Sequence, residues 1–449
     1  MIQLRMIKQW AIFVAFLFGI FANALSANEQ GVSQALVVYD SSLYDLNNLG
    51  SVSSEVASLV SDLKEKHGFE LTLQSYSDED LSLFVADEPR YDHLILLPSS
   101  KKAIGNKKGF NQHQLVEFIN REGNIFVVGN DETVLPDDVR TFLNEMGIYP
   151  APKGFKYVDH FNSAKGIPQL TDENIANKKV LGQFNGGKHA YKGTGALISN
   201  NENIFPIVRS SKTGFTTDEV EGTISQEKTW TFGQQGFLAV GFQGLNNARL
   251  TWVGSESLIN DDLLKWTFQE RNVLKLQFVQ HYKNENPEYV DNKLYRIKDQ
   301  VIYTIGVSEF ANDKWIPYEI KGEDDTLQLA FKMLDPYQRV NLQPLGPGSS
   351  KEDGDLTEDT YIYYANFTIP DQHGIFTFEL DYKRSGLSYI VDKRVVTVRH
   401  LANDEYKRSW DIPNSWLYVA SAALVVLGWF LFVVNFLYVG NTDATKKNV

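Results

Sequence analysis

The first third of the chain alternates short apolar runs with amphipathic segments. Residues 35–39 are an apolar run that ends in a polar turn. Residues 55–66 then carry apolar side chains at helical spacing, Gly68 follows, and an extended pattern resumes over 69–73. Buried parallel strands are continuous apolar runs, whereas amphipathic helices repeat every three to four residues. This order predicts a strand–helix–strand unit.

The alternation continues over three further segments, which we expect to be a strand, a helix and a strand: 94–97, 112–120 and 124–129. The region 180–263 carries strand patterns and glycine-rich turns, and we expect its segment 249–254 to return to the same sheet. Strands that alternate with helices favour a parallel sheet covered on both faces, with right-handed crossovers. We therefore expect one α/β domain of the Rossmann or flavodoxin kind over residues 28–270.

The second half of the chain has a different pattern. We expect a charged helical stretch over 261–282 and a polar link over 283–287. Alternating apolar and polar positions then predict about six short strands, at 294–308, 315–320, 327–334, 361–369, 374–382 and 394–398. The segment 346–358 is a loop by composition. Residues 271–413 are expected to form a β-sandwich next to a membrane.

The N-terminus is typical of a secretory signal peptide. Arg5 and Lys8 precede an apolar run over 10–21, and small residues follow up to Ala27. The run is shorter than the roughly 20 residues that cross a bilayer, so an anchor is disfavoured. We expect residues 1–27 to be removed.

Residues 416–439 carry no charge and are long enough to cross a membrane as a helix. With a signal peptide before it, this segment predicts a type I protein whose body is luminal and whose residues 440–449 are cytosolic. The small residues Ala420, Ser421, Ala422 and Ala423 are expected to let other membrane helices approach closely.

Two short signals fit this topology. Lys446 and Lys447 are the fourth and third residues from the carboxyl end, as in a dilysine signal for retrieval to the endoplasmic reticulum. The alternative is a pair of solvated lysines. The sole sequon, Asn366-Phe367-Thr368, lies on the luminal side, where a glycan can be attached.

Composition excludes several classes of function. The chain has 449 residues, with 43 Lys plus Arg against 56 Asp plus Glu, a net charge of −13. That sign disfavours a nucleic-acid partner. Because there is no cysteine, disulfides, thiolate nucleophiles and cysteine-bound metals cannot occur.

The sequence contains few motifs that would indicate a catalytic or metal-binding site. Asp78-Glu79-Asp80 fits the D-x-D pattern of metal-dependent glycosyltransferases, but we favour the interpretation that it is an acidic helix N-terminus. Asp159-His160 has no partner at a catalytic spacing, and 254–257 lacks the second glycine of a nucleophile elbow. The glycine-rich segments 186–188 and 193–195 match no phosphate-binding motif and are interpreted as turns. We expect no catalytic residue, metal or cofactor, which favours an accessory subunit.

Several segments resemble one family in the order that the family has them. They are 35–40 (ALVVYD), 67–73 (HGFELTL), 81–83 (LSL), 90–100 (RYDHLILLPSS), 157–161 (YVDHF), 246–257 (NNARLTWVGSES), 334–339 (LDPYQR), 369–382 (IPDQHGIFTFELDY) and 397–400 (TVRH). Together they resemble the 48-kDa-type subunit of oligosaccharyltransferase, also called the beta or wheat-germ-agglutinin-binding type, in a fungal form. The similarity covers nearly the whole mature chain.

The resemblance implies an essential, non-catalytic subunit of the complex that transfers an oligosaccharide from dolichyl diphosphate to Asn in Asn-x-Ser/Thr. It implies three protein partners: a multi-span catalytic subunit, a ribophorin II-type subunit and a small defender-against-death-type subunit. The luminal body would scaffold them and help to guide the dolichyl-linked oligosaccharide or the acceptor chain. Two rival functions are a luminal glycosyltransferase that uses Asp78 and Asp80, and a glycan-binding cargo or quality-control receptor.

Overall fold

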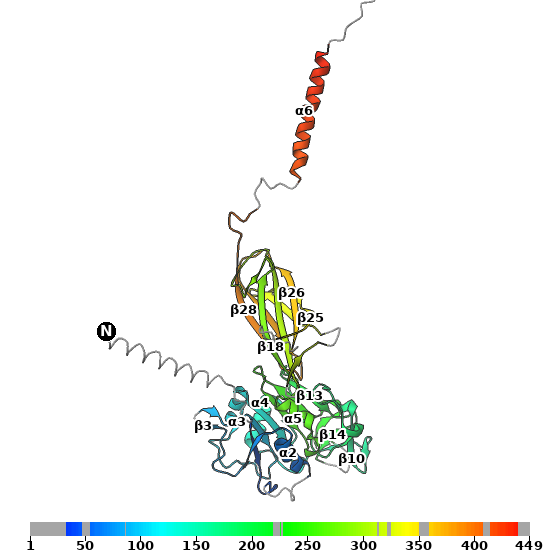
Figure 1. The fold of residues 1–449 in the computed structure, drawn as a ribbon. Helices are drawn as coiled ribbons and strands as arrows, with labels where there is room; N and C mark the ends of the chain where they lie inside the picture. Colours follow the sequence, from blue (N-terminus) through cyan, green and yellow to red (C-terminus); the bar gives the residue numbers. More distant parts are fainter. Residues whose placement is uncertain are drawn as a thin grey trace, which may run out of the picture.

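The computed structural model describes residues 33–46, 54–85, 87–218, 225, 228–311, 314–320, 325–349, 359–406 and 414–438. The expected signal peptide and the dilysine tail lie outside the described residues. Within this part, the chain forms an α/β region and a β-rich region, followed in sequence by a long apolar helix (Figure 1).

The described part of the α/β region is built on a nine-stranded sheet in the order β2-β1-β5-β6-β17-β16-β12-β7, with β13 paired to β16. Its first five strands run parallel: β2 (Glu70–Ser75), β1 (Gln34–Tyr39), β5 (His93–Leu96), β6 (Asn124–Val128) and β17 (Arg249–Val253). The others pair antiparallel: β16 (Phe237–Gln243), β12 (Ala196–Ile198), β7 (Ile148–Pro150) and β13 (Ile204–Arg209). The expected return of 249–254 to the sheet is confirmed. The sheet is mixed, however, because the second half of the region adds antiparallel strands.

Helices cover both faces of this sheet. Alternate residues of β1 point to opposite faces, so Ala35 and Val37 join one core cluster while Leu36 and Val38 join another. The first cluster includes apolar residues of α2 (Ser54–Glu65) and α5 (Asp261–Thr267), and the second includes those of α3 (Gln112–Asn120) and α4 (Asp137–Met146). The apolar stripe of α2 that the sequence predicts is the buried one.

The α/β region also contains shorter elements outside its main sheet. Two three-stranded sheets have the orders β11-β10-β9 and β15-β14-β8, and β3 pairs with β4. Their bounds are β3 (Phe84–Val85), β4 (Glu88–Pro89), β8 (Lys156–Val158), β9 (Ser163–Ala164), β10 (Ile167–Thr171), β11 (Lys188–Ala190), β14 (Phe215–Thr217) and β15 (Thr229–Phe232). Single 3-10 turns occur at η2 (Asp172–Asn174), η3 (Asn185–Gly187), η5 (Gly233–Gln235) and η6 (Glu256–Leu258).

The β-rich region packs two sheets around one core cluster. The described part of one sheet has the order β19-β18-β21-β26-β25, with β22 on β21; that of the other has the order β20-β28-β27-β23-β24. The strands of the first are β18 (Val273–Lys283), β19 (Asn286–Val290), β21 (Gln300–Ala311), β22 (Lys314–Pro317), β25 (Gln343–Gly348) and β26 (Thr360–Thr368). Those of the second are β20 (Leu294–Arg296), β23 (Gln328–Lys332), β24 (Pro336–Asn341), β27 (Gly374–Tyr382) and β28 (Ile390–Arg399).

The expected helical stretch over 261–282 is confirmed only as far as Thr267 and is wrong beyond it. The helix α5 ends at Thr267, and Gln269 and Asn272 adopt positive φ angles of 61° and 58°, which a helix cannot continue through. The rest of the stretch is β18, which pairs with β21 from Val273 to Lys283. Its β-branched and aromatic residues fit a half-buried strand, and tertiary pairing outweighs the charged helical pattern.

The two regions meet at a buried polar junction. Arg249 of β17 is fully buried, and its guanidinium donates to the backbone oxygens of Trp266, Arg271 and Asn272 at 2.6, 2.8 and 2.8 Å. The loop between β27 and β28 also contacts the α/β region: the indole N–H of Trp266 donates to Gly386 O at 3.0 Å. These bonds join the sheet of one region to the sandwich of the other.

The helix α6 (Ser415–Leu437) is the one described helix that is long and apolar enough to cross a membrane, by length and composition. It has 23 residues, a mean hydropathy of 2.4 and no buried residue in its most apolar window. It begins one residue before the span that the sequence predicts and ends two residues before that span's end.

Candidate functional site

The carboxyl ends of the parallel strands form one edge of the α/β sheet. The chain continues from β1 to β2 on one side, whereas β5 lies on the other side, so the strand order reverses between β1 and β5. In open α/β sheets, ligands bind outside the carboxyl ends of the strands at such a reversal. The loops that follow β1, β5, β6 and β17 are therefore where a ligand of this sheet is expected.

Asp40 occupies the reversal point. Its carboxylate accepts hydrogen bonds from the backbone N–H and the hydroxyl of Ser42 and from the backbone N–H and the hydroxyl of Ser100. It also accepts one from the hydroxyl of Ser99, and all five distances lie between 2.6 and 3.0 Å. Burial alone would raise the pKa of this carboxyl, but these bonds, led by that of Ser100, hold its pKa well below the ordinary value. Asp40 therefore joins the loop after β1 to the loop after β5, at the point where the strand order reverses.

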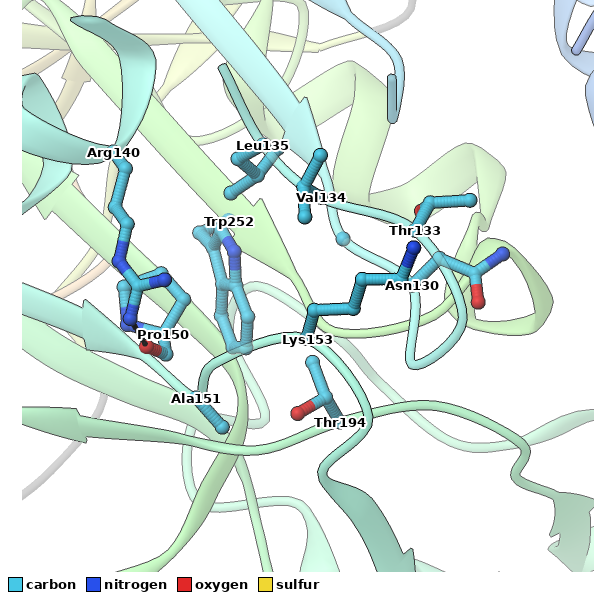
Figure 2. Close-up of a pocket in the computed structure, with 11 residues that line it drawn as sticks. Asn130, Thr133, Val134, Leu135, Arg140, Pro150, Ala151, Lys153, Thr194 and Trp252 are labelled. Carbon is cyan, nitrogen blue, oxygen red and sulfur yellow. Dashed lines mark hydrogen bonds between the residues drawn. The ribbon is translucent and has the colours of Figure 1, made fainter. Parts of the chain in front are cut away.

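A small cavity lies further along the same edge, between the ends of β6 and β17. We call it the Trp252 pocket, and its lining is Gly129, Asn130, Thr133, Val134, Leu135, Arg140, Pro150, Ala151, Lys153, Thr194 and Trp252. Its volume of about 20 Å³ has room for one water-sized group. Figure 2 shows the Trp252 indole in the middle of the lining, with Arg140 on one side and Lys153 on the other.

Three polar atoms of this lining are buried without a hydrogen-bond partner: Trp252 Nε1, Thr133 Oγ1 and Thr194 Oγ1. Trp252 is 0% exposed and Thr194 is 4% exposed. Buried polar groups in folded proteins nearly always have a partner, so this gathering marks the pocket as a candidate binding site.

Close backbone contacts fix the walls of the Trp252 pocket. Thr194 N donates to Gly254 O at 2.9 Å. A Cβ on Gly254 would lie 2.1 Å from Thr194 O, and one on Gly193 would lie 2.3 Å from Gly254 O. The glycine-rich segment 193–195 is therefore a connection packed against the sheet edge, and its glycines permit that approach.

Asp159 is a second buried polar centre, but it does not form a dyad with His160. Its carboxylate accepts from the hydroxyls of Ser211 and Thr213 and from the backbone N–H of Asn162. Burial would raise the pKa of Asp159, and these hydrogen bonds lower it overall. His160 is exposed and lies beside the ring of Phe215. Asp159 thus holds two loops together.

The interpretation of 78–80 as a helix N-terminus is wrong. Asp78 closes a turn by accepting from Ser75 N at 2.7 Å, and Asn106 donates to Leu81 O at 3.0 Å. Leu81 and Leu83 are buried in the sheet core as parts of a loop, so helical spacing is not needed to bury them. Among the described residues, no group of three or more His, Cys, Asp or Glu is arranged to hold a metal ion.

The other residues singled out by sequence are scattered. Asn366 lies on β26, where it and Thr368 are exposed while Phe367 between them is buried. On α6, Ala422 and Ala423 line a shallow apolar groove with Val419, Val426, Leu427, Trp429 and Phe430, whereas Ala420 and Ser421 do not line it. Lys446 and Lys447 lie beyond the residues that the structure describes.

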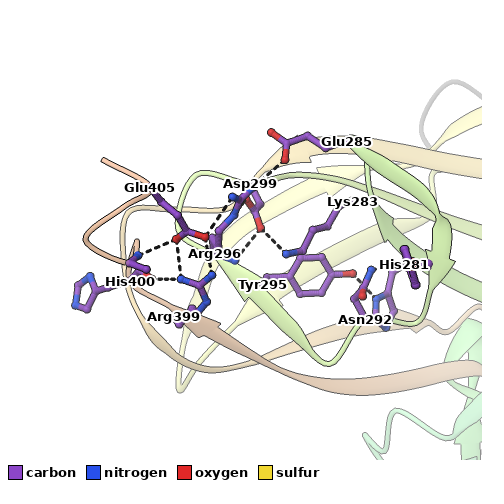
Figure 3. A network of polar contacts seen from close by, with 12 residues as sticks. His281, Lys283, Glu285, Asn292, Tyr295, Arg296, Asp299, Arg399, His400 and Glu405 are labelled. Carbon is purple, nitrogen blue, oxygen red and sulfur yellow. Dashed lines mark hydrogen bonds and ion pairs between the residues drawn. The ribbon is translucent and has the colours of Figure 1, made fainter. Parts of the chain in front are cut away.

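Sequence reasoning missed an ionic clamp at the exit of the β-rich region. Glu405 accepts two hydrogen bonds from Arg399, each at 2.8 Å, and lies 3.5 Å from Arg296, which pairs with Asp299 at 2.9 Å (Figure 3). The bonds from Arg399, with a further bond from Ala402 N, lower the pKa of Glu405 to about 2. The clamp holds the segment after β28 against β20. No local motif signals it, because Arg296 and Asp299 lie about 100 residues before Arg399 and Glu405 in the sequence.

Comparisons with known proteins cover nearly the whole chain. The family described as "OST48, N-terminal domain" matches residues 25–292, and "OST48 middle domain" matches residues 281–440. The chain is 35% identical over 437 residues to the dolichyl-diphosphooligosaccharide–protein glycosyltransferase subunit WBP1 of Saccharomyces cerevisiae, covering 94% of this chain and 95% of that protein.

Other relatives are similar over most of their length. The Schizosaccharomyces pombe subunit wbp1 is 31% identical over 81% of this chain and 85% of its own. The 48 kDa subunit of the same enzyme from Caenorhabditis elegans is 26% identical over 90% of this chain and 93% of its own. The solved structure titled "mmIFT52 N-terminal domain" aligns with 53% of this chain and 96% of its own at a TM-score of 0.35 and 12% identity, which supports no conclusion.

Proposed function

The chain belongs to the OST48 family, and on that premise we propose that it is an accessory, non-catalytic subunit of the oligosaccharyltransferase complex. That complex transfers a preassembled oligosaccharide from dolichyl diphosphate to Asn of Asn-x-Ser/Thr in nascent proteins. The observation that carries the proposal is the similarity to the yeast subunit WBP1, which extends over 94% of this chain. The two family matches, over 25–292 and 281–440, include both folded regions and α6.

We propose that the chain sits in the membrane of the endoplasmic reticulum with its body in the lumen. In this arrangement, residues 1–27 are a signal peptide, 28–270 and 271–413 are luminal domains, 416–439 is the membrane span and 440–449 is a cytosolic tail. Lys446 and Lys447 then return escaped protein to the endoplasmic reticulum, and Asn366 is open to glycosylation. The parallel strands β2-β1-β5-β6-β17 follow the 2-1-3-4-5 order of flavodoxin-like sheets, which supports that finer class for the first domain.

A scaffolding role suits the junction between the two regions. Arg249 holds three backbone oxygens from inside the α/β region, and the sandwich loop packs onto the same side chain. A body stiffened in this way can hold other subunits at a fixed spacing. We propose that it positions the multi-span catalytic subunit, the ribophorin II-type subunit and the defender-against-death-type subunit, and helps to guide the dolichyl-linked oligosaccharide or the acceptor chain.

The test is affinity purification of the full chain in mild detergent, with quantitative mass spectrometry of the proteins that come with it. Stoichiometric recovery of the multi-span catalytic subunit supports the proposal. Recovery of the chain alone, or with secretory cargo and free high-mannose glycan, contradicts it and favours a cargo or quality-control receptor.

A further inference from the structure

The Trp252 pocket brings together three buried polar atoms that lack a partner. Trp252 Nε1, Thr133 Oγ1 and Thr194 Oγ1 come from β17, from the loop after β6 and from the loop before β12. Burying an indole N–H or a hydroxyl without a hydrogen bond destabilises a fold. Three such groups around one cavity point to an occupant that accepts hydrogen bonds.

The charges around the pocket specify the occupant further. Arg140 and Lys153 line it, and neither forms an ion pair with a residue that the structure describes. The neighbouring acids lie beside other cations: Glu132 pairs with Lys192 at 3.1 Å, and Asp131 Oδ2, which has no hydrogen-bond partner, lies 3.5 Å from Lys156 Nζ. The lining itself contains no carboxylate. Two unpaired cations beside a donor-only indole N–H favour an anion over a neutral molecule.

The size of the pocket limits how the anion binds. About 20 Å³ holds one water molecule or one oxygen atom, so the rest of a larger group must stay toward the exposed side chain of Lys153. Its walls are preorganised, because the contact of Gly254 with Thr194 and the hydrogen bond from Arg140 Nη2 to Pro150 O at 3.1 Å fix two sides.

We propose that the Trp252 pocket is an oxyanion site, in which one oxygen of a carboxylate or phosphate group accepts a hydrogen bond from Trp252 Nε1, the threonine hydroxyls of the same lining supply further donors and Arg140 and Lys153 neutralise its charge. This site lies on the α/β region and does not depend on the subunit role proposed above. A ligand of either chemistry would bring its charged end to the sheet edge and leave its remainder in solvent.

The test uses the full chain in detergent, labelled with fluorotryptophan and followed by ¹⁹F NMR. The chain has 8 tryptophans, and Trp252→Phe assigns the resonance of Trp252 by its disappearance. Sodium acetate and sodium phosphate are titrated separately at constant ionic strength set by chloride. We expect the Trp252 resonance to shift saturably with at least one of them.

Variants then separate a built site from a general salt effect. Lys153→Gln, at an exposed position, and Thr194→Val, which keeps the side-chain shape, should each weaken binding at least fivefold. Lys188→Gln is the matched control, because Lys188 is an exposed lysine of the same region outside the pocket. Saturation with acetate alone identifies a carboxylate ligand, and saturation with phosphate alone identifies a phosphate ligand. If neither anion saturates, or if Lys153→Gln binds as Lys188→Gln does, the pocket holds water only and the proposal is wrong.

Discussion

Arg249 Nη2 donates a hydrogen bond to Ser388 Oγ at 3.0 Å, and this contact joins β17 of the α/β region to the loop before β28 of the sandwich. The guanidinium also lies 4.9 Å from the ring centre of Trp266. Burial lowers the pKa of Arg249 to about 9, so it remains a cation at neutral pH. Its hydrogen-bond partners are the backbone oxygens of three residues and one hydroxyl, so the junction is held without a carboxylate.

Arg249→Met should therefore destabilise the whole luminal body. It removes the hydrogen bonds from the guanidinium to the carbonyls of Trp266, Arg271 and Asn272, and we expect a loss of about 3 kcal/mol in the free energy of unfolding. Denaturant unfolding of the full chain in detergent, followed by circular dichroism, measures it. Arg271→Met is the control, because that side chain is part-exposed and pairs only with Asp262 among the described residues. Equal unfolding midpoints for the two variants would contradict the role of Arg249.

Asp40→Asn should destabilise the fold in a pH-dependent way. A carboxyl whose pKa is lower in the folded chain than in the unfolded chain stabilises the fold above its unfolded pKa, and this contribution is lost as pH falls toward the folded pKa. We expect a loss of about 2 kcal/mol at pH 7. The difference between wild type and variant should shrink below about pH 4, near the ordinary pKa of Asp. Unfolding curves at a series of pH values measure this, and a difference independent of pH would refute it.

Gly254→Ala should disrupt the sheet edge, because the added Cβ would lie 2.1 Å from Thr194 O, a backbone atom that cannot yield cheaply. We expect a loss of about 3 kcal/mol, or a failure to fold. Gly182→Ala is the matched control: its Cβ meets only Asp262 Oδ2, at 3.9 Å, and we expect an unchanged unfolding midpoint. Equal behaviour of the two variants would mean that the edge relaxes freely.

Substitution of the small residues of α6 should weaken the proposed complex. Ala422 and Ala423 line the groove of the helix, so Ala422→Leu with Ala423→Leu fills the space that a partner helix would enter. We expect co-purification of small membrane subunits to fall at least threefold, measured by quantitative mass spectrometry. Adding Ala420→Leu and Ser421→Leu should add little, since neither residue lines the groove. Val425→Leu, on an exposed position outside the groove, is the control; equal recovery with all variants would exclude packing through these residues.

Replacing Lys446 and Lys447 by serine should let part of the protein leave the endoplasmic reticulum. The proposed glycan at Asn366 reports the escape, because Golgi enzymes act on it and change the mass of the glycoprotein. Asn366→Gln, which removes the sole sequon, identifies the band that carries it. An unchanged mass and an unchanged location even when the complex is dissociated would argue against retrieval through these lysines.

The sequence predicted the elements whose apolar pattern and burial coincide. In β1 every apolar residue of 35–39 is buried, and in α2 the stripe of Val56, Leu59, Val60 and Leu63 is the buried face. The pattern failed at 268–282, where two positive φ angles end the helix and pairing with β21 decides the conformation. The spacing of apolar residues predicts neither the positive φ angles nor the pairing with β21.

The Trp252 pocket was beyond sequence reasoning for a different reason. Its residues come from β17, β7, α4 and several loops, and no two of its charged or unpartnered groups are at a spacing that signals chemistry. Trp252 lies in an apolar run, and that pattern predicts only a buried strand. Only the three-dimensional arrangement shows that its N–H has no partner.

The strand β28 begins two residues after Ser388 of the junction and ends at Arg399 of the clamp, and its ten residues span roughly 30 Å at about 3.3 Å per residue. The sandwich is therefore fastened at both ends of β28. Arg249 holds the end next to the α/β region, and Glu405 holds the other end (Figures 1 and 3). The α/β region lies at the opposite end of the sandwich from Glu405 (Figure 1). Because the sandwich is fastened at both ends, the sheet edge that carries the Trp252 pocket is held at a fixed distance from Glu405.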